Sequence, residues 1–225
     1  MFSLENIKKE ELEMIARIGD FAKKLIIYRN NLLTAMTFFI YGTFAVSGLL
    51  VGFGIFENWI YALMLLVIFC IIGTFLIVKA EILLKESFHI LRIEYNFKGP
   101  SYEGLRWILF FSAPFSIGYS LLSIIEVDVK IKTYLAGICW YPCLGVSLIL
   151  SDVFIMSYYI RSKIIITHFH GIAGIAILIT TPFVIIYGFF VGLNAVSILA
   201  TGLMLIIYAF TAVYAWLSAE KIFIG

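Results

Sequence analysis

Charged side chains are scarce in this chain: Asp, Glu, Lys and Arg make up 13% of its 225 residues. A soluble domain carries roughly a quarter charged residues. Hydrophobic residues make up 63%, and the mean hydropathy is +1.06. The interior of a soluble fold cannot hide so much apolar surface. The composition therefore excludes a soluble domain and predicts a chain that lies mostly within a lipid bilayer.

Cysteine is also rare, and its placement excludes a disulfide framework. The three cysteines, Cys70, Cys139 and Cys143, all lie within apolar stretches. An odd number of cysteines within apolar stretches is not typical of a fold held by disulfide bonds. We therefore interpret them as small buried thiols. Cys139 and Cys143 are four residues apart and share a helix face, which leaves a local disulfide open. Two thiols alone do not complete a tetrahedral metal site.

Motifs of common enzyme classes are missing. The sequence has no P-loop, no H-E-x-x-H and no G-x-S-x-G. We therefore expect a non-enzymatic protein without a cofactor, and we find no basic stripe suited to nucleic acid. His168 and His170 would point about 200° apart on a helix, so they cannot chelate one metal. We interpret both as interfacial histidines that sense pH or lipid headgroups.

Six apolar windows are long enough to cross a bilayer, since a helical span needs about 20 mostly apolar residues. Continuous helices also pair every backbone polar group internally, as hydrocarbon requires. The predicted fold class is an all-α membrane protein with six transmembrane helices, which together form a domain over residues 31–217. The windows are residues 31–56, 59–79, 106–126, 133–160, 164–190 and 193–217.

The distribution of positive charge predicts the orientation. Of the 16 Lys and Arg residues, all except Lys130 and Lys132 fall in segments that can lie on one side of the membrane. Cytoplasmic loops carry such an excess of positive charge. Both termini are therefore predicted to be cytoplasmic, with the helices arranged as three in-out-in hairpins. We expect a multi-pass protein of the cell (cytoplasmic) membrane.

Three segments are predicted to lie outside the bilayer on the cytoplasmic side. Residues 1–30 have a helical apolar period and form an amphipathic helix, which Asn30 and Asn31 separate from the first span. Two roles explain the amphipathic pattern of this helix. It docks on lipid or on the protein itself, or it recruits a partner. Residues 80–105 form a loop that begins as a helical extension of the second span. Residues 218–225 form a short tail.

The second loop and the start of the third span carry a loose pattern: Lys98-Gly99, Ser101-Tyr102, Arg106 and Ser112-Ala113-Pro114. This pattern resembles the entry to the third span in Yip-type membrane proteins. The resemblance covers roughly residues 80–190, and that family usually has five spans. It implies an association with vesicle traffic and small GTPases, and it names no catalytic residue.

Asp152 is an acidic residue deep within a predicted span. It lies nine residues before Arg161, hence about 13 Å along a helix from the cytoplasmic end. An ionised carboxylate there is costly unless it is paired, hydrated or protonated. With its neighbours Ser151 and Tyr158, it is a candidate for a substrate or ion pathway. The alternative is a protonated or hydrogen-bonded Asp152 that only fixes helix packing.

Three prolines lie inside predicted spans and predict helix kinks, namely Pro114, Pro142 and Pro182. Kinked spans, a buried acid and the missing catalytic motifs favour a pore, a transporter or a membrane-embedded subunit of a translocation complex. The alternative is a structural or anchoring protein that recruits a cytoplasmic partner. An intramembrane enzyme or redox protein is a third reading. The expected partners are the lipid bilayer and either further copies of the chain or another membrane subunit.

Overall fold

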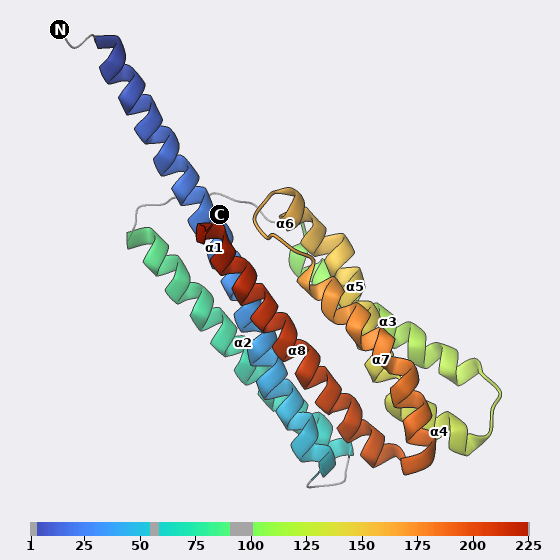
Figure 1. Ribbon diagram of the computed structural model, residues 1–225. Coiled ribbons are helices and arrows are strands. Elements are labelled where there is room, and N and C mark those ends of the chain that lie inside the picture. Colours follow the sequence, from blue (N-terminus) through green and yellow to red (C-terminus); the bar gives the residue numbers. More distant parts are fainter. Residues whose placement is uncertain (1–3, 55–58, 91–100, 225) are drawn as a thin grey trace.

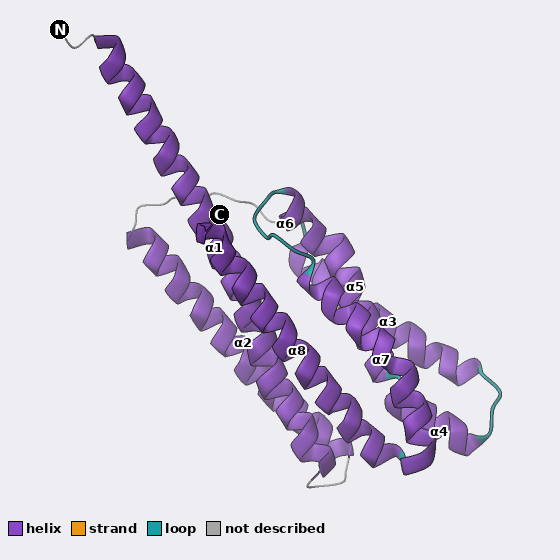
Figure 2. Ribbon diagram, viewed as in Figure 1, coloured by secondary structure: helices purple, strands orange, loops and turns teal. Residues whose placement is uncertain are grey.

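The computed structural model describes residues 4–54, 59–90 and 101–224, and these are almost entirely helical (Figures 1 and 2). Within these ranges, six helices are long and apolar enough to cross a membrane. This confirms the all-helical class and agrees with an integral membrane protein. The elements are α1 (Leu4–Gly54), α2 (Trp59–Ile90), α3 (Glu103–Ile124), α4 (Val129–Ile138), α5 (Trp140–Ser151), a π-helical turn (Asp152–Met156), α6 (Ser157–Arg161), α7 (Phe169–Val191) and α8 (Leu193–Ile224).

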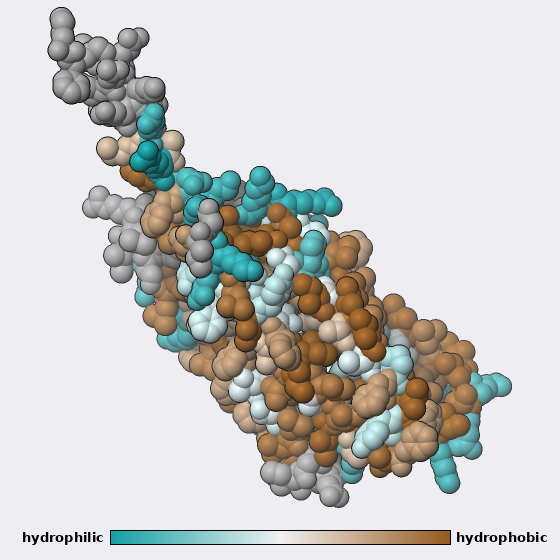
Figure 3. Space-filling view, viewed as in Figure 1, coloured by the Kyte–Doolittle hydropathy of each residue, from teal (hydrophilic) through white to brown (hydrophobic). Residues whose placement is uncertain are grey.

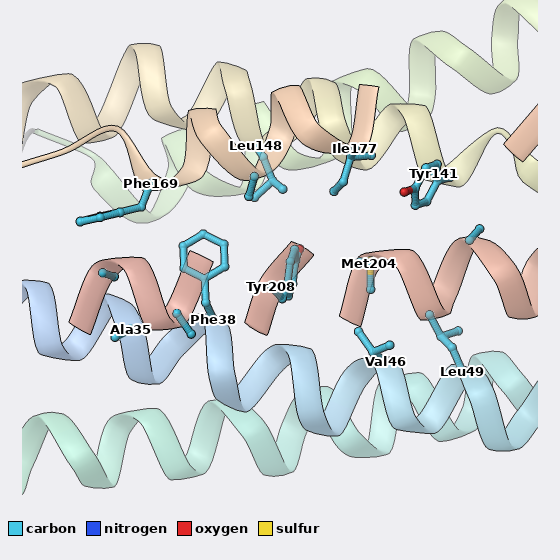
Figure 4. Packing of buried hydrophobic residues seen from close by; sticks show 14 of the residues in the cluster. Ala35, Phe38, Val46, Leu49, Tyr141, Leu148, Phe169, Ile177, Met204 and Tyr208 are labelled. Atoms are coloured by element: carbon cyan, nitrogen blue, oxygen red, sulfur yellow. The ribbon is translucent and has the colours of Figure 1, made fainter. Parts of the chain in front are cut away.

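The helices pack as two groups that meet between α7 and α8. In one group α1 lies between α2 and α8, and in the other α5 lies between α3 and α7 (Figure 1). Apolar side chains from both groups fill the space where they meet (Figure 4). There the ring of Phe38 on α1 lies edge-on to Tyr208 on α8, with centroids 5.3 Å apart. Leu148 on α5 and Ile177 on α7 lie opposite them (Figure 4).

The face of the bundle in Figure 3 is mostly apolar along its length, and hydrophilic surface lies toward its ends. Large side chains point outward from the bundle, for example Ile71, Ile179 and Phe210, which are 65%, 73% and 74% exposed. Hydrophilic surface gathers near α6 and the end of α8, and a smaller hydrophilic area lies at the α3–α4 connection (Figure 3). Such an apolar belt matches the hydrocarbon core of a bilayer. It accounts for the high share of hydrophobic residues in the chain.

The prediction of a separate N-terminal helix that ends at Asn30 and Asn31 is wrong, because α1 runs through both residues without a break. Asn31 is fully buried, and its Nδ2 donates a hydrogen bond of 2.7 Å to the carbonyl oxygen of Ile27. The Asn31 side chain thus forms a hydrogen bond within α1 and does not interrupt the helix. The first half of α1 extends beyond the rest of the bundle (Figure 1). We refer to residues 4–28 as the arm.

Other boundaries differ from the predicted spans. The span predicted over residues 133–160 is interrupted at Cys139, between α4 and α5, and Pro142 lies in the first turn of α5, where a missing N–H is tolerated. The span predicted from residue 164 begins only at Phe169, because residues 162–168 form a loop. The predicted tail is helical as far as Ile224. The helical extension of the second span reaches Ile90, while residues 91–100 of the predicted loop lie outside the described ranges.

Helices α5 and α7 approach each other closely at two glycines. A Cβ atom on Gly174 would lie 2.6 Å from the carbonyl oxygen of Gly145 and 2.8 Å from the side chain of Ile149. Contacts this short do not occur in folded proteins, so only glycine allows this separation of the two backbones. The close approach brings the end of α5 next to the start of α7, where the candidate site lies.

Candidate functional site

The candidate site begins where α5 passes into the π-helical turn. Asp152 is the first residue of this turn and is 3% exposed. The wider π-helical winding releases the regular backbone pairing, and the Ser157 hydroxyl donates a hydrogen bond of 3.1 Å to the Asp152 carbonyl oxygen. Single π-helical turns within α-helices are frequent at functional sites. This turn therefore sets the direction of a buried carboxylate.

His168 is the partner of this carboxylate. It is the residue before the first turn of α7, and its Nδ1 atom is hydrogen-bonded to Oδ2 of Asp152. The side chain of Asp152 is 5% exposed and that of His168 is 55% exposed. The imidazole thus joins a buried acid to the surface at the α6 end of the bundle. Sixteen residues separate the two in sequence, and the loop over residues 162–168 brings them together.

The second carboxylate oxygen, Oδ1 of Asp152, is buried and has no hydrogen-bond partner among the described residues. Gly171 lies on the other side of the carboxylate, where a Cβ atom would be 3.0 Å from Oδ2. The glycine therefore leaves room beside the acid that any other residue would fill. An unsatisfied buried polar atom costs about 1–3 kcal/mol, so its retention calls for a functional explanation.

The Asp152–His168 pair can exchange protons. With Asp152 ionised, the Nδ1–H of His168 donates to the carboxylate; with Asp152 protonated, its O–H donates to Nδ1. The pair thus passes one proton between an exposed and a buried group without breaking its hydrogen bond. No group of three or more His, Cys, Asp or Glu side chains comes together in the described ranges. One carboxylate and one imidazole suit a proton better than a multidentate metal ion.

Hydrogen bonds to α1 and to α6 hold the loop that carries His168. Asn31 of α1 accepts a hydrogen bond of 3.4 Å at Oδ1 from the backbone N–H of Ile166. The backbone N–H of Ile164 donates to the carbonyl oxygen of Tyr159 at 2.9 Å, and Lys163 takes a left-handed conformation with φ 57°. Ile164 and the next residue, Ile165, are buried. The position of His168 therefore depends on α1 as well as on α6.

The other residues proposed from the sequence lie around the pair. The Ser151 hydroxyl donates to the carbonyl oxygen of Ser147 at 2.8 Å, which places it along its own helix. Tyr158 is 42% exposed, and its ring lies edge-on to Tyr159. The prediction that His170 is interfacial is wrong, because it is 9% exposed, with its ring near the ring of Phe38. Apolar helices pack around it, although it is only two residues from His168.

Comparisons with known proteins do not extend this assignment: no family model, curated protein or solved structure matches the chain. The resemblance to Yip-type proteins therefore stays a prediction. Lys98 and Gly99, which begin its pattern, lie outside the described residues, and Pro114 lies within the continuous helix α3.

Replacing Asn31 by alanine should loosen the loop over residues 162–168. The change leaves the N–H of Ile166 without its acceptor and should lower the free energy of unfolding by about 1–3 kcal/mol. Thermal unfolding in detergent micelles and proteolysis after Arg161 or Lys163 measure the two effects. Asn30→Ala is the matched control, because among the described residues the Asn30 side chain accepts its hydrogen bond from the neighbouring Arg29 and none from the loop. Equal behaviour of the two variants would contradict the role of Asn31.

Proposed function

We propose that this chain is a transport protein, or the membrane-embedded subunit of a translocation complex, in which protons pass through Asp152 and His168 during transport. The observation that carries the proposal is a buried carboxylate with one free oxygen, joined by a hydrogen bond to a half-exposed imidazole. Intramembrane acids of this kind are costly and mark ion or proton pathways.

The protein's own residues supply the steps of proton uptake. His168 takes a proton from the aqueous side through its exposed edge and passes it to Oδ2 of Asp152 through the existing hydrogen bond. Neutralising Asp152 removes the cost of a buried charge and changes the preferred packing of the π-helical turn against Gly171. Such a change in a packed helix pair is the kind of two-state event that couples a proton to a conformational change.

The orientation of the protein is part of the proposal. The α6 end of the bundle carries Arg161 and Lys163, and the predicted excess of positive charge places this end in the cytoplasm. His168 lies at the same end. The site then exchanges protons with the cytoplasm of a cell whose plasma or cytoplasmic membrane holds the protein.

The test is proton flux into proteoliposomes that hold a trapped pH indicator, driven by a potassium diffusion potential. Wild-type vesicles should take up protons faster than empty ones. His168→Gln keeps a hydrogen-bond donor for Asp152 but cannot bind a proton, so it should lower proton uptake to the level of empty vesicles. Lys163→Gln, in the same exposed loop, is the control. Wild-type flux equal to that of empty vesicles at every pH would refute the proposal.

A second candidate function is the anchoring of a cytoplasmic partner by the arm, and one observation favours it. Four large apolar side chains of the arm, Met14, Ile15, Ile18 and Phe21, are 56–66% exposed. The arm leaves the bundle as a straight continuation of α1 (Figure 1). Of the four, Phe21 lies nearest the bundle, with its ring centroid 6.3 Å from that of Phe223 on α8. The resemblance to Yip-type proteins supports this candidate, because that family is associated with small GTPases.

Serine in place of Met14, Ile15 and Ile18 should abolish cross-linking of any protein that binds this face. The measurement is cross-linking in native membranes, followed by mass spectrometry of the products. Serine in place of Glu13 and Asp20, which lie on the same arm and are also exposed, is the control. An identical set of cross-linked proteins from wild type and the apolar-face variant would rule out recruitment by this face.

A further inference from the structure

Cys139 and Cys143 face each other at the junction of α4 and α5, far along the bundle from Asp152. Their Sγ atoms are 3.6 Å apart, and both thiols are free. Cys143 is 7% exposed, and its thiol donates a hydrogen bond of 3.3 Å to the carbonyl oxygen of Pro114 on α3. Cys139 is half-buried. The two sulfurs thus differ in access while touching each other.

A glycine on the neighbouring helix leaves room for the two sulfurs. Gly118 on α3 lies against both: a Cβ atom there would be 2.6 Å from Sγ of Cys143 and 3.1 Å from Sγ of Cys139. On a regular helix, Cβ atoms four residues apart are about 5–6 Å from each other, too far for a disulfide, which needs about 3.5–4.5 Å. The missing N–H of Pro142 removes one helical hydrogen bond at this turn and allows the necessary shift.

We propose that Cys139 and Cys143 form a redox-active pair that hydroperoxides oxidise to an intramolecular disulfide. The more exposed Cys139 reacts first. Its sulfur attacks the terminal oxygen of the hydroperoxide, an S–O bond forms, the O–O bond breaks, and the thiol proton goes to the departing oxygen to give water or an alcohol. Cys139 becomes a sulfenic acid.

Cys143 then resolves the sulfenic acid, because its sulfur already lies in contact. Its sulfur attacks Sγ of Cys139, the S–S bond forms, the S–O bond breaks, and hydroxide leaves with the proton of Cys143 as water. Two thiols and one hydroperoxide thus give a disulfide, a water and an alcohol (or a second water). Every product at the protein is neutral, as suits sulfurs in apolar surroundings. Oxidation also removes the hydrogen bond from Cys143 to Pro114.

Hydroperoxides reach this position from two sources: hydrogen peroxide from the aqueous phase, and lipid hydroperoxides from the bilayer. The test uses reduced protein in nanodiscs of saturated phosphatidylcholine, exposed to hydrogen peroxide or to cumene hydroperoxide. Samples are quenched in acid, unfolded, alkylated and mapped by mass spectrometry. The expected result is joint loss of two alkylatable thiols at Cys139 and Cys143, at least about tenfold faster than at Cys70. The faster of the two reagents identifies the source.

Variants separate the two steps. Cys143→Ser should stop the reaction at a sulfenic acid on Cys139 that dimedone traps, whereas Cys139→Ser should leave Cys143 no more reactive than Cys70. Gly118→Ala should slow disulfide formation by displacing the sulfurs, while Gly104→Ala on the same helix, with nothing within 4 Å, should not. Equal oxidation of all three cysteines, a disulfide only between chains, or no sulfenic acid in Cys143→Ser would overturn the proposal.

Discussion

Asparagine in place of Asp152 should lower proton flux by about a hundredfold, to the leak of empty vesicles, because positioned acids and bases contribute factors of this size or more to proton transfer. Asparagine has nearly the shape of aspartate and still offers His168 a hydrogen-bond partner, but it neither ionises nor carries a proton. The fold should therefore persist while the function is lost. The measurement is the indicator assay described above, with expression and thermal unfolding recorded alongside.

The control for this variant is Asp20→Asn, which makes the same chemical change on the exposed arm and should leave the flux unchanged. Unchanged flux in a folded Asp152→Asn protein would reduce Asp152 to a packing residue. That outcome is the structural alternative considered from the sequence. The experiment therefore decides between the two readings of one buried acid.

Alanine in place of Gly174 should destabilise the protein by about 1–3 kcal/mol, the usual cost of overpacking a close contact. The new methyl group would lie 2.6 Å from the carbonyl oxygen of Gly145, which is backbone and cannot turn away. Helices α5 and α7 must then separate, and the Asp152–His168 hydrogen bond should lengthen with them. A lower thermal midpoint, together with a lower proton flux, is the expected pair of results.

Gly202→Ala provides the opposite result on α8. No atom lies within 4 Å of a Cβ placed on Gly202, so alanine adds only its better helix propensity, worth up to about 1 kcal/mol. The thermal midpoint of this variant should be equal to or above that of the wild type. If Gly174→Ala and Gly202→Ala shifted the midpoint in the same direction, close packing of α5 on α7 would not be the explanation.

The number and class of the helices could be predicted from the sequence, because long apolar windows have few alternatives in a bilayer. The boundaries were harder. Asn30 and Asn31 are poor helix residues by propensity, yet tertiary contacts override propensity: Asn31 is buried and bonded to both Ile27 and Ile166. The start of α7 was misplaced for a related reason. Ile164 and Ile165 are buried residues of the loop over residues 162–168 and do not belong to a span.

The sequence predicts the acid of the candidate site but not its partner. Asp152 stands out in any reading of the sequence, since acids within spans are rare. Its partner could not be inferred, because the contact with His168 depends on the π-helical turn and on the path of the following loop. Ser151 and Tyr158 are predicted as part of the pathway only because they lie near Asp152 in the sequence. The one available hint to the pairing was a histidine at the start of the next span.

The unbroken course of α1 has a mechanical consequence. A helix of 51 residues is about 75 Å long and has no hinge at residues 30–31, so it moves as a stiff rod. A force that tilts the arm must also tilt the half of α1 that packs against α8. Asn31 lies on this lever, at the hydrogen bond to the loop that carries His168. Displacement of the arm and protonation of the buried acid would then act on one and the same loop.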